Sequence, residues 1–254
     1  MAGNGRSATV APSSGPARVP DGLRVYAVGD VHGRLDLLQQ TERMIFRDLE
    51  TRPVERALSI YLGDFIDRGP DSCKVVDYLL TAQSDGLQRR FLRGNHEETM
   101  LQFLEEPGIV ESWRRYGGLE TLVSYGVDVR ELMRGAGAEE ARQALRRALP
   151  GEHLAFLQNL ETLLVIGDYC FVHAGLKPGV PLDRQTPESM LWIREEFMDF
   201  AGDFGKVVVH GHTPVDEPAR LPNRISVDTG AYLTGRLTTA VLEGESVGFL
   251  TTGR

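Results

Sequence analysis

The chain has 254 residues, which suits one domain with a full core, or one domain with an insert. Apolar residues make up 41% and charged residues 25%, as in ordinary soluble proteins, and a net charge of −8 disfavours nucleic acid as a partner. No apolar run is long enough for a transmembrane helix, no signal peptide is recognisable, and the two cysteines lie far apart. We therefore expect a cytoplasmic protein with no membrane partner and no disulfide framework, and the sequence leaves the oligomeric state open.

The chain begins with a predicted tail and then alternates between strands and helices. Residues 1–20 are rich in Gly, Ser, Ala and Pro, which predicts a disordered tail before a single domain over 21–254. Apolar, β-prone runs predict strands over residues 23–28, 57–62 and 87–92. Each strand is followed by helical spacing, over residues 35–49, over 72–83 and from 97 onwards. This order is typical of βαβ units in a partly parallel sheet, where ligands bind at the carboxyl ends of the strands.

The second half of the chain has a different pattern. A polar stretch rich in Arg and Glu predicts a helical insert over about residues 113–159. Two β-prone runs flank a Gly-Asp turn and predict a hairpin over residues 161–166 and 169–173. A helix is expected over residues 189–200. Short runs predict a β-rich, antiparallel C-terminal part with strands over residues 207–210, 225–227, 237–242 and 246–250.

Five short, glycine-containing blocks follow β-prone runs and hold five of the six histidines. These blocks are GDVHGR (29–34), GDFIDRGPDS (63–72), RGNHEE (93–98), VHAG (172–175) and HGHTP (210–214). Histidine, aspartate and asparagine supply the ligands that divalent cations prefer. The blocks together predict one site for metal and phosphate.

The first two blocks offer two carboxylates and an imidazole. Asp30 and His32 are two residues apart after a strand, so an extended backbone would place both side chains on one face, towards one metal ion. A turn aspartate beside a surface histidine would explain this pair equally well. Asp64 follows the next strand, and its two carboxylate oxygens can bridge two ions.

The second and third blocks add groups for phosphate binding and proton transfer. Arg68 has a planar fork that matches phosphate oxygens, and Asp67 can accept a hydrogen bond from an imidazole and orient it. A surface salt bridge in a turn is the alternative for this pair. Asn95 offers an amide oxygen to a metal or else caps a helix. The adjacent His96 would point elsewhere, as expected of a proton donor.

The late histidines complete the candidate set. A single histidine at a strand end is more often structural, but His173 and His212, added to the earlier residues, favour metal ligands. We expect His210 to be structural or to support the site, His153 to be an ordinary surface or core histidine, and Asp228 to be a turn residue.

Six residues are therefore candidate ligands for two ions: Asp30, His32, Asp64, Asn95, His173 and His212. Two ions roughly 3.5–4 Å apart bind phosphoryl oxygens and convert a water to hydroxide near neutral pH, the usual arrangement for phosphoester hydrolysis. Other mechanisms fit worse, because the sequence has no arginine-bearing loop after Cys73, no nucleotide P-loop and no G-x-S-x-G elbow.

The motifs GD-x-HG, GD-x-x-DRG and GNHE, in this order, resemble those of the PPP-type metallophosphatases. These include the serine/threonine protein phosphatases, with short bacterial and phage forms, and the symmetrical diadenosine tetraphosphate hydrolases. The resemblance covers about residues 24–236. It implies an α/β fold of the calcineurin-like metallophosphatase type, with two mixed β-sheets sandwiched between helical layers.

The resemblance also implies roles for individual residues. The implied ligands of a first metal are Asp30, His32 and Asp64, and those of a second are Asp64, Asn95, His173 and His212. His96 resembles the general acid, with Asp67 as its partner, and Arg68 resembles a phosphate clamp. Leu191 to Glu195 resembles a bacterial and phage block that contains a second clamp arginine, so Arg194 is the candidate, although its helical position also suits a surface arginine. The implied cofactors are two divalent ions, Mn first and Fe, Zn or Ni as alternatives.

Three functions are consistent with these residues. The main prediction is hydrolysis of phosphoserine and phosphothreonine in proteins or peptides, by direct attack of hydroxide held between the two metals, with His96 as the acid. The alternative is a symmetrical dinucleoside polyphosphate hydrolase, but Glu97 and Glu98 after GNH resemble the protein-phosphatase branch, since the hydrolase branch favours Asp-Leu there. A non-catalytic scaffold that binds phosphoproteins is the third hypothesis, and it does not explain why every ligand position is filled.

Overall fold

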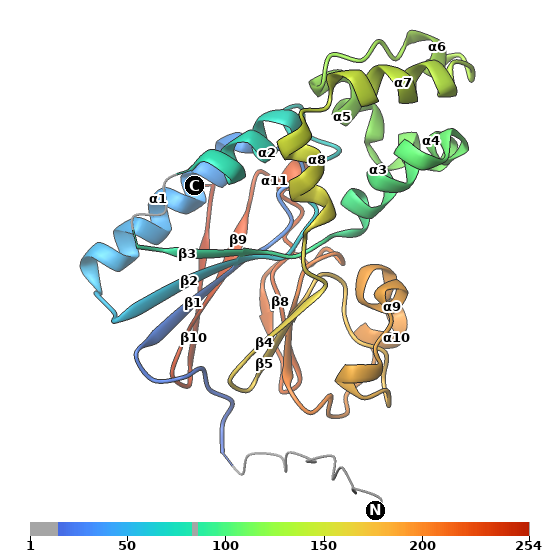
Figure 1. Cartoon of the computed structure of the whole chain (residues 1–254). Coiled ribbons are helices and arrows are strands. Elements are labelled where there is room, and N and C mark those ends of the chain that lie inside the picture. Colours follow the sequence, from blue (N-terminus) through green and yellow to red (C-terminus); the bar gives the residue numbers. More distant parts are fainter. Residues whose placement is uncertain (1–14, 83–85, 254) are drawn as a thin grey trace, which may run out of the picture.

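The computed structural model describes residues 15–82 and 86–253. In this part of the chain two five-stranded mixed β-sheets pack face to face (Figure 1). The first has the order β10-β9-β1-β2-β3, with β1 (Leu23–Val28), β2 (Arg56–Tyr61), β3 (Gln88–Phe91), β9 (Thr238–Glu243) and β10 (Ser246–Thr251). The second has the order β4-β5-β6-β8-β7, with β4 (Leu163–Ile166), β5 (Tyr169–Val172), β6 (Val207–His210), β7 (Ala219–Arg220) and β8 (Arg224–Ser226).

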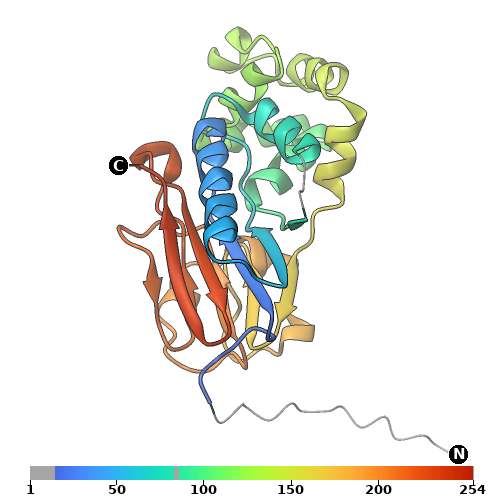
Figure 2. The ribbon, with the colours of Figure 1, turned by 90° about the vertical axis from the view of Figure 1, so that its left-hand side faces the viewer.

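Helices cover the outer faces of both sheets, so the predicted sandwich of two mixed sheets between helical layers is confirmed (Figures 1 and 2). The first sheet is covered by α1 (Leu35–Thr51) and α2 (Ser72–Thr81), and the second by α9 (Pro187–Trp192) and α10 (Glu195–Met198). The other longer helices are α3 (Asn95–Glu105), α7 (Ala138–Ala148) and α8 (Gly151–Gln158). Shorter ones are α4 (Val110–Trp113), α5 (Gly118–Ser124), α6 (Arg130–Met133) and α11 (Ala231–Thr234). The predicted helical insert corresponds to α4 to α8. No helix in the described residues is long and apolar enough to cross a membrane.

The alternation of side chains along the strands explains the two cores. On β1, Val25 and Ala27 point into the core between the sheets, whereas Tyr26 and Val28 point into the core under the helices. Successive side chains of a strand point to opposite faces, so a strand that is buried on both faces is apolar throughout. Strand β5 alternates in the same way between the inter-sheet core and the core under α9 and α10.

Three expectations need correction. The C-terminal part is not all antiparallel, because β5, β6 and β8 are parallel neighbours joined by long crossovers. The helix predicted over residues 189–200 is broken at Arg194, whose φ of −131° and ψ of −98° are not helical. The predicted tail is too long: Val19 is buried and its N–H donates to Gly244 O at 3.0 Å. Residues 1–14 lie outside the described residues.

The topology brings the loops of both sheets to one edge. Strands β1, β2 and β3 are parallel, and so are β5, β6 and β8, so their carboxyl ends gather at the same end of the sandwich. In Figure 2 the helices of the insert lie above this end. The five motif blocks are therefore neighbours in space.

Candidate metal centre

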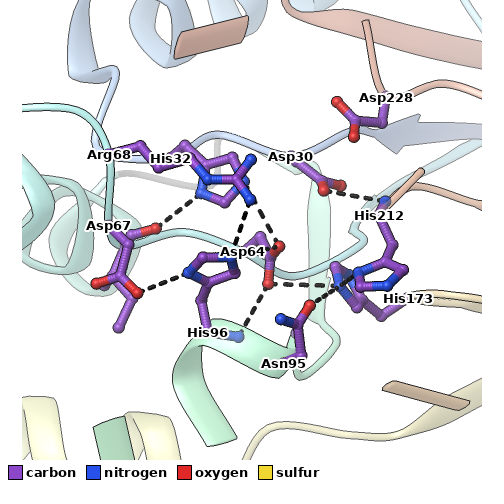
Figure 3. Close-up of polar contacts among 12 residues, drawn as sticks. Asp30, His32, Asp64, Asp67, Arg68, Asn95, His96, His173, His212 and Asp228 are labelled. Carbon is purple, nitrogen blue, oxygen red and sulfur yellow. Dashed lines mark hydrogen bonds and ion pairs between the residues drawn. The ribbon is translucent and has the colours of Figure 1, made fainter. Parts of the chain in front are cut away.

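Figure 3 shows the polar side chains that meet at this edge, and all six predicted metal ligands are among them. They come from loops after β1 (Asp30, His32), after β2 (Asp64), at the start of α3 (Asn95), after β5 (His173) and after β6 (His212). All six side chains are buried. The sequence motifs are thus one site in the folded chain.

Left-handed backbone turns aim several of these side chains. Among the described residues, the non-glycine residues with positive φ are His32 (46°), Asp64 (51°), Asp67 (71°), Arg68 (68°) and His212 (64°). This conformation costs about 1–2 kcal/mol per residue, and such outliers gather at functional sites. It also corrects the expectation for His32, which reaches the site through a left-handed turn and not from an extended strand.

The first group of ligand atoms combines Asp30, His32 and one oxygen of Asp64. His32 Nε2 lies 3.5 Å from Asp64 Oδ2, and His32 Nδ1 donates to Ile66 O at 2.9 Å. Asp30 Oδ2 accepts the backbone N–H of His212 at 3.0 Å, which leaves Oδ1 free to face the site. A Cβ on Gly211 would come within 2.0 Å of Asp30 Oδ1, so only glycine at position 211 allows this approach.

The second group uses the other oxygen of Asp64. Asp64 Oδ1 lies 3.4 Å from His173 Nε2, and this nitrogen is 2.9 Å from Asn95 Oδ1 and 3.1 Å from His212 Nδ1. The Nδ1 of His173 donates to Leu62 O at 2.9 Å. Because each Asp64 oxygen faces one group, Asp64 lies where a bridging ligand would.

These donor atoms are suited to binding divalent cations, and several of them have no hydrogen-bond partner among the other side chains of the site. Leu62 O and Ile66 O can only accept, so the ring hydrogens of His173 and His32 lie on Nδ1 and the lone pairs of Nε2 face carboxylate oxygens of Asp64. Asp30 Oδ1, His32 Nε2 and His212 Nε2 are buried without a hydrogen-bond partner in the described chain. A mixed set of carboxylate, amide and imidazole donors matches Mn, Fe, Zn or Ni.

The protonation of the three candidate histidine ligands suits metal binding. Burial lowers the pKa of His32 to about 3 and that of His212 to about 2, and it also lowers the pKa of His173. All three imidazoles are therefore neutral at pH 7, and a neutral imidazole is the form that binds a metal.

The carboxylates carry negative charge that the protein leaves poorly neutralised. Burial raises the pKa of Asp30 well above its ordinary value, and the charges of Asp228 and Asp64 raise it further. Burial also raises the pKa of Asp228, to about 6. Burial would raise the pKa of Asp64 as well, but the surrounding imidazoles outweigh it and lower that pKa. Cations at this position would offset the repulsion.

His96 lies beside the ligands but has a different partner. Its Nδ1 is 2.6 Å from Asp67 Oδ2, which points Nε2 towards Asp64 Oδ2 at 3.7 Å (Figure 3). Burial alone would lower the pKa of His96, but the charge of Asp64 and the hydrogen bond to Asp67 raise it to about 9. A protonated imidazole beside the candidate ligands suits a proton donor better than a fourth ligand of the first group, although His96 Nε2 also lies close to that group.

Two arginines border the site. Arg68 Nη2 lies 3.4 Å from His96 Nε2, and Arg194 Nη1 donates to His212 O at 3.1 Å. The helix breaks at Arg194, so this residue is not helical as expected, but its side chain is exposed as a surface arginine would be. The phosphate-clamp roles of both arginines stay predictions.

Glu97 has a structural role at the site that the sequence did not predict. It lies in the first turn of α3 as expected, but it is fully buried. Its carboxylate accepts backbone N–H groups of Gly94 and Asp64 at 2.9 Å each and of Phe65 at 2.8 Å. Glu97 thereby ties the loop after β2 to the start of α3. The spacing from Gly94 to Glu97, as in a capping box, was the available signal.

The remaining polar residues behave largely as expected. Asp228 accepts the N–H of Gly230 at 2.9 Å as a turn residue does, but it is also buried near Asp30. His210 turns away from the ligands, with Nε2 2.8 Å from Ser226 Oγ and its ring against Phe197. His153 is a buried histidine paired with Tyr125 and Asp77.

Fold and donor atoms together define a metal-dependent phosphoesterase, and comparison with known proteins agrees. The model of the calcineurin-like phosphoesterase family matches residues 23–237. The chain belongs to this family, whose members use a dinuclear divalent metal centre.

Several relatives are similar to the chain over most of its length. The asymmetrical bis(5′-nucleosyl)-tetraphosphatases PrpE of Bacillus velezensis and Bacillus subtilis are each 27% identical, over 83% of this chain and 86% and 87% of their own length. The enzyme of Anoxybacillus flavithermus is 25% identical over 83% of this chain and 87% of its own length.

Solved structures share the fold. A crystal structure described as a candidate diadenosine tetraphosphatase has a TM-score of 0.63 at 21% identity, covering 91% of this chain and 94% of its own. A serine/threonine phosphatase from Saccharomyces cerevisiae has a TM-score of 0.52 at 14% identity, covering 94% of this chain and 84% of its own. At these identities the likeness concerns the fold alone.

Proposed function

We propose that the chain is a metal-dependent hydrolase of dinucleoside tetraphosphates that works in the cytoplasm with Mn²⁺ as its preferred cation. Relatives that match over 86–87% of their own length and are named bis(5′-nucleosyl)-tetraphosphatases support this substrate class. They favour the alternative considered from the sequence over the hydrolysis of phosphoproteins. Their asymmetrical cleavage also differs from the symmetrical cleavage that the motifs suggested.

The structural observation that carries the proposal is an aromatic ring at the rim of the site. Tyr232, on α11, has 38% of its surface exposed, and its ring centroid lies 5.5 Å from that of His32. The guanidinium carbon of Arg68 lies 4.6 Å from the same ring centroid. An exposed ring beside a phosphate clamp suits a substrate whose phosphates continue into a nucleoside, because base stacking contributes about 1–3 kcal/mol.

The two glutamates after GNH do not favour a protein phosphatase once their contacts in the fold are known. The resemblance relied on Glu97 and Glu98 after GNH. In the fold Glu97 is fully buried against the loop after β2, and Glu98 pairs with Arg93 at 3.0 Å. A residue that substrate cannot touch does not select the substrate by contact. Phosphoserine and phosphothreonine peptides therefore remain only as competing substrates in the test below.

The chain's own residues divide the work of hydrolysis. Asp30, His32 and Asp64 would hold one divalent ion, and Asp64, Asn95, His173 and His212 the other. When bound, these ions supply Lewis acidity and lower the pKa of water. Arg68 and Arg194 orient and neutralise the phosphate. His96 Nε2 donates its proton to the departing oxygen while Asp67 holds Nδ1, and a proton from solvent then restores His96.

A substrate panel tests this function. With Mn²⁺ present, we expect kcat/KM for diadenosine tetraphosphate to exceed that for phosphoserine, phosphothreonine and phosphotyrosine peptides by more than about tenfold, a difference of ~1.4 kcal/mol. Chromatography of the products distinguishes ATP with AMP, expected from asymmetrical cleavage, from two ADP. Faster hydrolysis of a phosphopeptide would overturn the proposed substrate.

A variant series tests the aromatic rim. Tyr232→Leu should raise KM for diadenosine tetraphosphate by about tenfold and leave p-nitrophenyl phosphate nearly unaffected, while Tyr232→Phe should keep KM low because the ring is retained. Leu233, 78% exposed on the same short helix, offers a matched control as Leu233→Ala. Equal KM values for all variants would exclude base stacking on Tyr232.

A further inference from the structure

The helical insert reaches the site through the carboxylate of Asp67. Oδ2 of this fully buried residue lies 2.6 Å from His96 Nδ1 and accepts the indole N–H of Trp113 at 2.7 Å. The other oxygen accepts the hydroxyl of Thr121 at 2.5 Å. Trp113 ends α4 and Thr121 lies in α5, so two helices of the insert hold the partner of His96.

The insert also holds the backbone of the same turn. The N–H of Arg68 donates to Gly117 O at 3.2 Å, and that of Asp67 donates to Thr121 Oγ1 at 2.9 Å. A Cβ on Gly117 would lie 2.4 Å from Arg68 N, and one on Gly118 would lie 2.5 Å from the Trp113 ring. The two glycines let the insert close directly onto a turn whose two residues both have left-handed φ.

We propose that Trp113 and Thr121 are positioning residues for proton transfer, so that the helical insert is part of the catalytic apparatus. Neither side chain is exposed, so neither can touch substrate. They fix the Asp67 carboxylate by donors from separate helices. Asp67 in turn fixes the ring of His96, whose Nε2 must point at the departing oxygen for efficient proton transfer. A carboxylate that lost these donors would rotate and allow the imidazole to turn away.

This inference rests on the acid role proposed for His96, but not on the choice of a nucleotide substrate. Its signature is a dependence on the leaving group. Phenolate needs a proton from the acid much more than p-nitrophenolate does, because p-nitrophenol is the stronger acid. Misplacing His96 should therefore slow hydrolysis of phenyl phosphate much more than that of p-nitrophenyl phosphate, whereas a general loss of structure slows both equally.

The test compares Trp113→Phe and Thr121→Val with the native protein loaded with Mn²⁺. We expect kcat for phenyl phosphate to fall about tenfold or more, kcat for p-nitrophenyl phosphate to fall by less than about threefold, and KM to stay the same, since general acid catalysis as a whole contributes about 10²–10⁴-fold. Thr121→Ser keeps the hydroxyl and should restore the native ratio. Phe103→Leu alters packing against Trp113, 5.1 Å away between ring centroids, without removing a donor, and should change both substrates equally.

His96→Asn separates failure of this inference from failure of the proposed mechanism. If His96→Asn shows no loss selective for phenyl phosphate, the acid role and the inference both fall. If His96→Asn shows the selective loss but Trp113→Phe and Thr121→Val do not, the positioning role of Trp113 and Thr121 is wrong and the acid role of His96 stands. In support of it, Thr121→Val should have no further selective effect when combined with His96→Asn, because it acts through that residue.

Discussion

Two buried clusters of charged side chains lie close to β2, and they differ in where their positive charge comes from. In the first, Glu42 on α1 accepts hydrogen bonds from Tyr61 and, at 2.8 Å, from Tyr78, and it pairs with Arg89 at 3.0 Å. The second is the metal centre, which begins only a few residues after Tyr61. There, within the described residues, no arginine or lysine forms an ion pair with Asp30, Asp64 or Asp228.

The difference separates a structural role from a functional one. Glu42 has both oxygens paired and a cation inside the protein, so its cluster is complete without a ligand. The carboxylates of the metal centre repel one another, and Asp30 Oδ1 has no hydrogen-bond partner among the residues that the structure describes. Buried carboxylates that repel one another and form no ion pair with an arginine or lysine in the described residues therefore mark the place where an external cation would bind.

The largest effect is expected from removing the carboxylate of Asp64, which faces both groups of candidate ligand atoms. Asp64→Asn should lower kcat/KM by about 10³-fold or more, equivalent to ~4 kcal/mol, because both ligand groups lose a charged oxygen. The fold should persist, since asparagine tolerates the left-handed φ of 51° and can still accept the N–H of His96. Steady-state kinetics with metal analysis of the purified protein checks this. If Asp64→Asn stayed active with full metal content, the prediction that Asp64 binds both metal ions would be wrong.

Whether a contact in these two clusters could be predicted depends on how far apart its residues lie in the sequence. The meeting of the candidate metal ligands at one edge could be predicted, because each lies in a short motif after a β-prone run and parallel strands bring such ends together. The contacts of Asp67 could not, since Trp113 and Thr121 are 46 and 54 residues away and carry no motif of their own. The same holds for Glu42, which is indistinguishable in sequence from any charged helix residue.

The sequence also did not predict the break in one helix or the strand pairing of the second sheet. Periodicity indicated a continuous helix over residues 189–200, but the chain breaks at Arg194, and this break brings the arginine to His212. Strand pairing in the second sheet was predicted as antiparallel because short strands and turns alternate there. The order of pairing depends on the crossovers through α9 and α10, and local pattern contains no information about it.

A smaller effect, on stability alone, is expected in the Glu42 cluster. Glu42→Gln should lower the free energy of unfolding by about 3–5 kcal/mol, because the charge of Arg89 then stays buried without its partner. Activity per folded molecule should not change. Urea denaturation of the metal-free protein measures the loss, with the exposed Glu50 on the same helix as a control in Glu50→Gln. A loss below about 1 kcal/mol would show that Arg89 is not held by Glu42.

In the metal centre, replacing a carboxylate by an amide should change the free energy of unfolding in the opposite direction. In metal-free protein, Asp30→Asn should raise the free energy of unfolding at pH 7 by roughly 1 kcal/mol, because it removes a buried charge that Asp228 and Asp64 repel. The amide oxygen can still accept the N–H of His212. With Mn²⁺ in excess the order should reverse, since native protein gains about 2.7 kcal/mol at 100 times the dissociation constant and the variant gains less.

The pH dependence gives this last prediction a second check. The folded-state pKa of Asp30 is raised above its unfolded value of about 3.9, so the destabilising charge is fully present above the folded pKa and disappears as the pH falls towards the unfolded value. The advantage of Asp30→Asn in chelator should therefore shrink steadily on acidification from pH 7. An advantage that is absent at pH 7, or that grows as the pH falls, would mean that Asp30 is not the uncompensated charge that sets this region apart from the Glu42 cluster.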